Sequence, residues 1–244
     1  MKNLQQKWLD ELDYLNNSER IKDILDRKIA LFRSVVLENN DLDLFLELVY
    51  CLLTAQTKFV SAYKVQEELK FDESFETRLF HSSDSDLFNY LMPILRKNII
   101  RFHNNKTRNI VFARNLFIKN KKYLLREKLL SFEDNFERRT WLIDNVLGLS
   151  FKEASHFLRN IGYGQDLAIL DRHVLRTLNF IGVIDKIPEV LNKTVYLENE
   201  KILRNFSEFL GVSMERLDFL LFALSKKNIE GESVSVFELI EGLK

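Results

Sequence analysis

Apolar residues recur along almost the whole chain at the three- and four-residue spacing of helices that bury one face. This pattern predicts helices over about residues 3–16, 19–38, 58–70, 84–97 and 150–161, and two or three more after about residue 190. The mostly apolar run "LFLELVYCLLTAQT" predicts a buried helix that ends near Thr57. The hydrophobic pattern therefore favours an all-α fold.

Polar and glycine-containing segments separate the other predicted helices. The stretch "HNNKT" predicts a polar loop over 103–107, with a helix after it to about residue 119 and a charged helix over about 122–130. Gly148 ends a helix in "SFEDNFERRTWLIDNVL", and Gly162 ends the helix over 150–161. The apolar "LAIL" leads into a helix from Asp171 to about residue 181. Only seven glycines and two prolines occur, which fits short connections.

Composition limits the class of protein and the kinds of site it can build. Hydrophobic residues make up 46% of 244, enough for a substantial core. Cys51 is the single cysteine, so an internal disulfide, a cysteine-ligated zinc site and an iron–sulfur cluster are excluded. The first twenty residues are charged throughout, and no apolar stretch reaches about 18 residues. We therefore expect a cytoplasmic protein that does not enter a membrane.

Charge is balanced overall but concentrated locally. Lysine and arginine total 36, as do aspartate and glutamate. Residues 96–128 nevertheless contain eleven basic residues and one glutamate, a net charge of +10. This segment is either a solvated helical surface or a surface that faces phosphates, and charge alone leaves both interpretations open.

Lys152 occupies an unusual position for a cation. Ser150 opens "SFKE", which predicts a capping box in which the hydroxyl accepts from the N–H of Glu153. Lys152 is then the second residue of a helix whose N-terminus carries roughly +0.5 charge, which favours a neutral amine. A neutral amine is a nucleophile, although a tolerated exposed lysine is the simpler interpretation.

Asp171 lies nineteen positions later at the start of the next helix. An apolar approach, an aspartate and then "RHVLRTLNFI" predict that Asp171 is the N-cap. Capping alone explains the residue. A carboxylate fixed in this way also stays ionised and can stabilise a cation.

The turn around Gly148 forms a third feature, because it joins two helices by a short connection. Such a turn directs backbone N–H groups at a helix start outward, where they bind phosphate. Gly148 and Ser150 are therefore candidate DNA-contacting residues, although "LGLS" alone is a weak signal.

Turn, lysine and aspartate at this spacing resemble the helix–hairpin–helix DNA glycosylase superfamily. The string "FKEASHFLRNIGY…AILDRHVLR" resembles in particular the type 2 8-oxoguanine DNA glycosylase/lyases of archaea and some bacteria. The resemblance implies two helical subdomains with a DNA-binding cleft between them. Residues 40–163 would form the central subdomain, and residues 1–39 with 164–244 would form the second.

The resemblance also implies catalytic roles. Lys152 would attack C1′ of the damaged nucleotide, expel the base, form a Schiff base and cut the strand by elimination. Asp171 would stabilise the developing positive charge and assist proton transfer. Neither a metal nor a cofactor is expected for this chemistry.

Further residues match family positions around the base and the DNA. His156 and Phe222 would face the everted base, Asp218 would accept from it, and the terminal carboxylate of Lys244 would enter its pocket. Phe222 also fits a core residue, and Asp218 a solvated carboxylate. The residues expected to contact DNA, besides those of the hairpin, are Gln56, Arg101, Phe102, His103, Lys106 and Arg108.

Two other functions remain open. A glycosylase of the same fold could act on other lesions, although the common pyrimidine-specific type has four cluster cysteines and alkylpurine enzymes generally lack the lysine. A non-catalytic DNA-binding module would need neither Lys152 nor Asp171. For the leading interpretation, the expected partner is double-stranded DNA with a damaged base, bound by a monomer.

Overall fold

The computed structural model describes the backbone of residues 2–229 and the side chains of residues 5–225. It contains two compact units. The central unit is Ser34–Ile161, and the terminal unit combines Met1–Arg33 with the chain from Gly162 onward. Nearly all regular structure in the described residues is helical, which confirms the all-α prediction.

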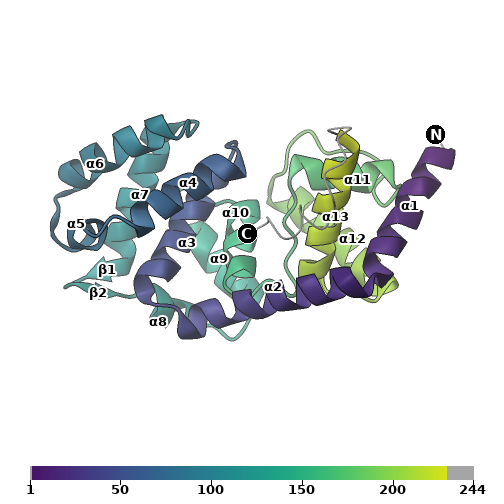
Figure 1. Ribbon diagram of the computed structural model, residues 1–244, viewed down its shortest axis with the longest axis horizontal. Helices are drawn as coiled ribbons and strands as arrows, with labels where there is room; N and C mark the ends of the chain where they lie inside the picture. Colours follow the sequence, from purple (N-terminus) through teal and green to yellow (C-terminus); the bar gives the residue numbers. More distant parts are fainter. Residues whose placement is uncertain (1, 230–244) are drawn as a thin grey trace. The chain divides into compact units, whose positions relative to one another are not determined.

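The central unit is built around one apolar helix, α3 (Asp41–Thr54), which packs against α4, α7, α8 and α10 (Figure 1). Ten of the fourteen residues of α3 are buried, as its sequence predicts. The other helices of this unit are α4 (Phe59–Lys70), α5 (Phe75–His81), α6 (Asp84–Lys97), α7 (His103–Phe117), α8 (Leu125–Leu130), α9 (Asn135–Asn145) and α10 (Phe151–Asn160). The boundary between Arg33 and Ser34 falls within α2 (Glu19–Glu38).

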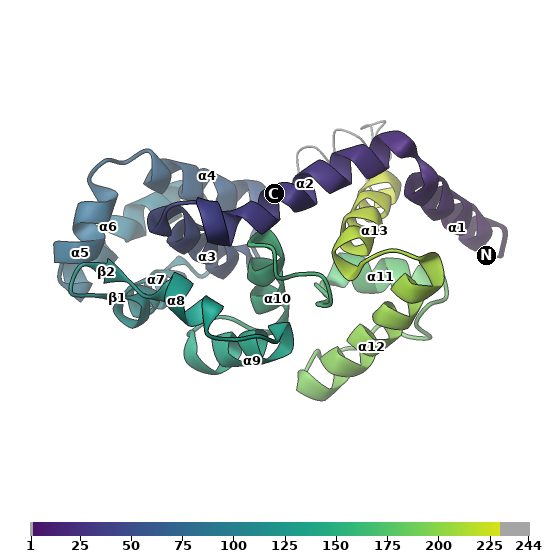
Figure 2. The same cartoon turned by 90° about the horizontal axis from the view of Figure 1, so that it is seen from below.

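The terminal unit is organised in the same way around α13 (Met214–Ile229). This helix packs against α1 (Lys2–Asn17), α11 (Arg172–Phe180) and α12 (Lys193–Leu210) (Figure 2). Leu217, Leu220 and Leu221 of α13 are fully buried. None of the helices in the described part of the chain is long and apolar enough to cross a membrane.

Three elements differ from the sequence-based predictions. Residues 103–107 belong to the first turns of α7 and not to a loop, because Phe102 adopts a left-handed conformation with φ 55° and turns the chain directly into the helix. The expected helix over 122–130 begins only at Leu125, after a two-stranded hairpin of β1 (Ile118–Lys119) and β2 (Lys122–Tyr123). The short helix α5 was not predicted.

Candidate functional site

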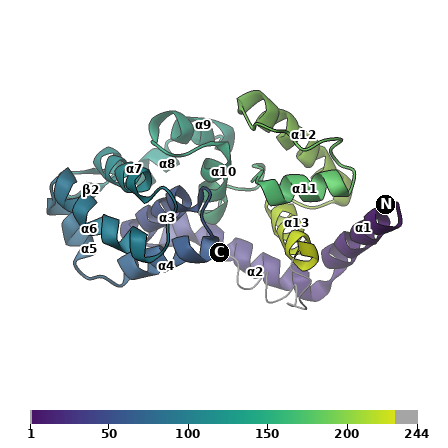
Figure 3. The ribbon, with the colours of Figure 1, turned by 90° about the horizontal axis from the view of Figure 1, so that it is seen from above.

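A tight turn joins α9 to α10, and these helices pack side by side in the central unit (Figure 3). Gly148 lies in this turn with φ +93°, a conformation that disfavours other residues. A Cβ at this position would lie 2.0 Å from Nδ2 of Asn109 on α7. The backbone conformation therefore favours glycine here, and a larger residue would also displace the side-chain amide of Asn109.

The start of α10 differs from the expected capping box. Ser150 is the N-cap, as predicted, but its side chain makes no hydrogen bond to a backbone N–H of the first turn. The hydroxyl instead donates to the carboxylate of Glu153. A hydroxyl has one proton to donate and two lone pairs that accept, and Ser150 uses the proton here while no first-turn N–H reaches its lone pairs. The predicted hydrogen bonding of the capping box is therefore wrong.

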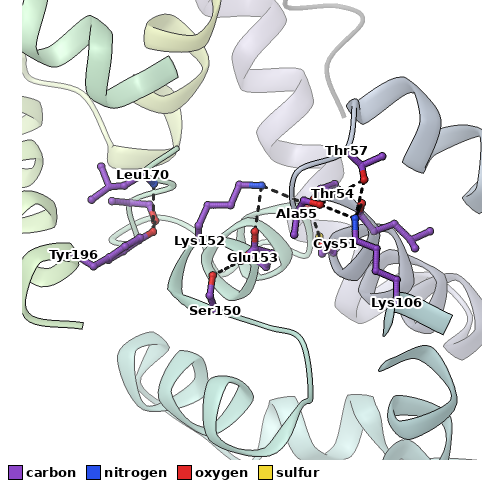
Figure 4. Close-up of polar contacts among 12 residues, drawn as sticks. Cys51, Thr54, Ala55, Thr57, Lys106, Ser150, Lys152, Glu153, Leu170 and Tyr196 are labelled. Atoms are coloured by element: carbon purple, nitrogen blue, oxygen red, sulfur yellow. Dashed lines mark hydrogen bonds and ion pairs between the residues drawn. The ribbon is translucent and has the colours of Figure 1, made fainter. Parts of the chain in front are cut away.

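Lys152 is the second residue of α10, as predicted, and its amine lies near two polar groups (Figure 4). Nζ donates to Oγ1 of Thr54 at 3.4 Å and lies 3.9 Å from Oε1 of Glu153. The Thr54 hydroxyl in turn donates to the carbonyl of Cys51 at 2.8 Å. The side chain of Lys152 is 21% exposed, so the amine is held against the end of α3 but is still reached by solvent.

Burial keeps two groups that interact electrostatically with Lys152, the His156 ring and the Cys51 thiol, in their uncharged forms. Burial lowers the pKa of His156 well below its usual value, and the charges of Arg159 and Lys152 lower it further. Its ring packs edge-on against Tyr50, with centroids 5.7 Å apart. Burial likewise raises the pKa of the Cys51 thiol, which is fully covered. His156 is therefore uncharged and, at 9% exposure, largely covered in this structure.

Asp171 is the N-cap of α11 in the terminal unit, which confirms its predicted structural role. Its Oδ1 accepts from the N–H of Val174 at 2.8 Å. The cap uses one of the two carboxylate oxygens, and the side chain is partly exposed. The carboxylate is thus fixed in direction while one oxygen stays available for a ligand.

The segment before Asp171 is bound by one face of α12. Arg204 donates to the carbonyl of Asp166 at 3.0 Å, and Glu200 accepts from the N–H of Ala168 at 2.8 Å. The hydroxyl of Tyr196 donates to the carbonyl of Ala168 at 2.7 Å and accepts from Leu170 at 3.3 Å. Figure 4 shows this last contact. These side chains are spaced four residues apart and pair with the backbone as a neighbouring strand would, which fixes the approach to Asp171.

Two exposed loops of the central unit carry other predicted site residues. Gln56 lies in the turn after α3, is exposed, and has φ 51°. Phe102 precedes α7, is 56% exposed, and has the guanidinium of Arg101 over its ring at 5.6 Å. His103 accepts from Nε of Arg96 at 3.3 Å. Left-handed conformations are uncommon for residues other than glycine and often occur at functional sites.

Lys106 does not face solvent as we expected. The residue is 5% exposed, and its ammonium donates to the carbonyls of Leu53 and Ala55 and to the hydroxyl of Thr57. Burial lowers the pKa of Lys106 to about 8, which still leaves an ammonium at neutral pH. The predicted phosphate contact of Lys106 is therefore wrong, because its donors are used inside the protein.

The other predicted residues fall into three groups. Arg108 on α7 is exposed, while Asp218 and Phe222 on α13 of the terminal unit are partly exposed. Lys244 lies outside the described residues. Within the described range, no three histidine, cysteine, aspartate or glutamate side chains gather closely enough to hold a metal ion. The sequence-based predictions missed Thr54, which accepts from Lys152, and Thr57, which accepts from Lys106. In "LTAQT", only Gln56 resembled a functional residue.

Comparison with known proteins gives concordant results. Residues 25–212 match the family model described as 8-oxoguanine DNA glycosylase. An 8-oxoguanine DNA glycosylase/AP lyase of Fusobacterium nucleatum is 34% identical over 214 residues, which cover 86% of this chain and 94% of the relative. The Methanocaldococcus jannaschii protein of the same name is 36% identical over 217 residues, 88% of this chain and 95% of the relative.

Solved structures agree with these sequence matches. The crystal structure of the Methanocaldococcus jannaschii 8-oxoguanine DNA glycosylase aligns with a TM-score of 0.74 and 33% identity, covering 95% of each chain. The structure of the Methanocaldococcus jannaschii glycosylase/lyase in complex with a 15-mer DNA containing 8-oxoguanine aligns with a TM-score of 0.73 and 32% identity. It covers 93% of this chain and 98% of that one.

Proposed function

The chain belongs to the family of 8-oxoguanine DNA glycosylase/AP lyases, and from this premise we propose that Lys152 is the nucleophile that excises 8-oxoguanine and Asp171 its supporting carboxylate. The observation that carries the proposal is the amine at the start of α10, directly after the hairpin turn. The family match over residues 25–212 spans both groups.

The proposed reaction begins with the uncharged amine of Lys152. Its lone pair attacks C1′ while the bond between C1′ and N9 breaks, and the base leaves with the bonding electrons and takes up a proton. The nitrogen loses a proton and the sugar ring opens, which gives a Schiff base between Nζ and C1′. Removal of a C2′ proton then expels the 3′ phosphate and cuts the strand.

Asp171 has a separate proposed role in this reaction. Positive charge develops on the sugar as the base departs, and an ionised carboxylate stabilises it. The cap to Val174 supports this role because it fixes the carboxylate without using its second oxygen. The neutral ring of His156 is suited to contact a base without adding charge.

The proposed partner is double-stranded DNA, because a damaged base must leave the stack before C1′ can be reached. The α9–α10 turn would bind a phosphate through N–H groups that Ser150 does not cap. Gln56, Phe102 and their neighbours would contact the duplex where the base has left. One copy of the chain is sufficient for this scheme.

Borohydride trapping on a duplex with 8-oxoguanine opposite cytosine tests the proposal. We expect a covalent protein–DNA adduct that is lost in Lys152→Gln and retained in Lys64→Gln, a change of an exposed lysine on α4. Excision that continues unaltered in Lys152→Gln would exclude the assigned nucleophile. Adducts on other lesions alone would indicate another specificity, and binding without excision of any lesion would indicate a non-catalytic module.

A further inference from the structure

The buried ammonium of Lys106 is fully matched by acceptors from one short stretch of chain. It lies 2.7 Å from the carbonyl of Leu53, 2.6 Å from that of Ala55 and 2.7 Å from the hydroxyl of Thr57 (Figure 4). An ammonium has three N–H donors, and each finds one acceptor here. Two of the acceptors are carbonyls at the C-terminal end of α3, where a cation is also favoured by the helix dipole. The lysine thus fastens the turn that carries Gln56.

The same residue is tied to the second exposed loop through its backbone. The N–H of Lys106 donates to the carbonyl of Phe102 at 3.0 Å, which closes the first turn of α7. Lys106 therefore bonds on one side to the turn of Gln56 and on the other to the residue that begins α7. Both Gln56 and Phe102 are exposed and both adopt a left-handed conformation, with φ of 51° and 55°.

Such conformations persist only when the surrounding structure enforces them. Both neighbours of Gln56 accept from Lys106: Ala55 through its backbone carbonyl and Thr57 through its hydroxyl. Without these bonds, the turn would keep the bond from the N–H of Thr57 to the carbonyl of Thr54 but would lose its contacts with α7 through Lys106. A loop that must be ordered during binding binds more weakly than one that is already formed.

We infer that Lys106 is a positioning residue, which fastens the Gln56 turn to the Phe102 loop so that both meet DNA as one pre-formed surface. This inference rests on the proposed function, because it assigns the two loops to the duplex around the excised base. Lys106 itself does not touch DNA, since its donors are used within the protein. Its side chain bonds only to the stretch that carries Gln56, so the effect of these bonds is expected through that turn. The charges of Lys106 and Lys152 also interact, and Thr57→Val, which leaves both charges in place, separates the two effects.

A double-mutant cycle tests this dependence. Single-turnover excision of 8-oxoguanine from a duplex is compared in the wild type, Lys106→Met, Gln56→Ala and the double variant. We expect a roughly ten-fold decrease in each single variant and no further decrease in the double variant, because both changes remove the same contact. Thr57→Val removes one of the three acceptors without changing charge, and should reduce excision two- to three-fold. Lys64→Met, which removes a charge from an exposed lysine of the same unit, should leave the rate unchanged.

A second readout does not depend on excision. Each variant is bound to a duplex with a tetrahydrofuran abasic analogue opposite 2-aminopurine, whose fluorescence reports unstacking of the orphaned base. We expect Lys106→Met and Gln56→Ala to lose the fluorescence change to the same extent. Trapping on single-stranded DNA with a natural abasic site should be unchanged in Thr57→Val, since that step depends on the Lys152 amine and this variant leaves the charges near it in place.

The outcomes distinguish a failure of the positioning role of Lys106 from a failure of the proposed function. If Lys106→Met loses its native circular dichroism, Thr57→Val provides the same test at unchanged charge. Independent, multiplicative effects of Lys106→Met and Gln56→Ala on excision would overturn the positioning role, as would wild-type fluorescence in Lys106→Met. A wild type that changes the fluorescence but never excises 8-oxoguanine would overturn the proposed function and leave the positioning role standing.

Discussion

The helices α10 and α11 begin with almost the same backbone conformation but use their first polar side chain differently. Ser150 has φ −106° and ψ −177°, and Asp171 has φ −100° and ψ 176°. Asp171 accepts from the N–H of Val174, whereas Ser150 donates to Glu153. An ionised carboxylate can only accept, whereas the Ser150 hydroxyl donates its proton to Glu153 and accepts from no first-turn N–H in this geometry. Similar backbones therefore give one capped helix start and one whose N–H groups are not capped by a side chain.

The two starts are also reached in different ways. A glycine turn packed against Asn109 precedes α10, and a segment bonded to three side chains of α12 precedes α11. The start of α10 has first-turn N–H groups that the Ser150 side chain does not cap, and N–H groups of this kind bind anions. The segment before α11 is satisfied within the protein, which suits a residue that must keep one direction.

The largest expected effect is on excision by Asp171→Asn, a change that keeps the helix cap and removes the negative charge. Asparagine caps a helix about as well as aspartate, so Asp171→Asn should keep the stability of the fold. It removes the negative charge, and excision should fall by about 10²- to 10⁴-fold. Single-turnover excision and thermal unfolding measure the two properties. A variant that excises normally would show that Asp171 only caps α11.

The next effect concerns the turn before α10. Gly148→Ala places a Cβ against Asn109 in a left-handed conformation, and should lower the free energy of unfolding by about 2–4 kcal/mol. Gly211→Ala is the matched control, because Gly211 also has a positive φ but a Cβ there meets nothing within 4 Å. It should cost about 1 kcal/mol. Equal losses in chemical unfolding would show that the contact with Asn109 is unimportant.

The smallest expected effect is a change in the free energy of unfolding when each N-cap, Ser150 or Asp171, is replaced by alanine. Ser150→Ala removes no hydrogen bond to a first-turn N–H, and should change the free energy of unfolding by less than about 0.5 kcal/mol. Asp171→Ala removes a true cap and should cost about 1 kcal/mol or more. Urea unfolding of both variants compares them. A larger loss in Ser150→Ala would mean that its bond to Glu153 stabilises α10 as strongly as a cap.

The sequence predicted those features that depend on neighbouring residues. The extents of α10 and α11, the N-cap at Asp171 and the buried α3 all follow from local spacing and capping signals. The start of α7 was missed because Phe102 adopts a left-handed conformation without the glycine that usually signals one. The role of Lys106 depends on acceptors about fifty residues away, in a basic segment where charge suggested exposure.

Cys51 carries one further consequence for an enzyme that acts on oxidised DNA. The thiol is fully buried in α3, and burial raises its pKa, so the reactive thiolate is scarce. Peroxides attack the thiolate form, and oxidation of an accessible cysteine can proceed to irreversible acids. Because this is the single cysteine of the chain, we expect its thiol to resist the oxidants that create the lesion which the family removes.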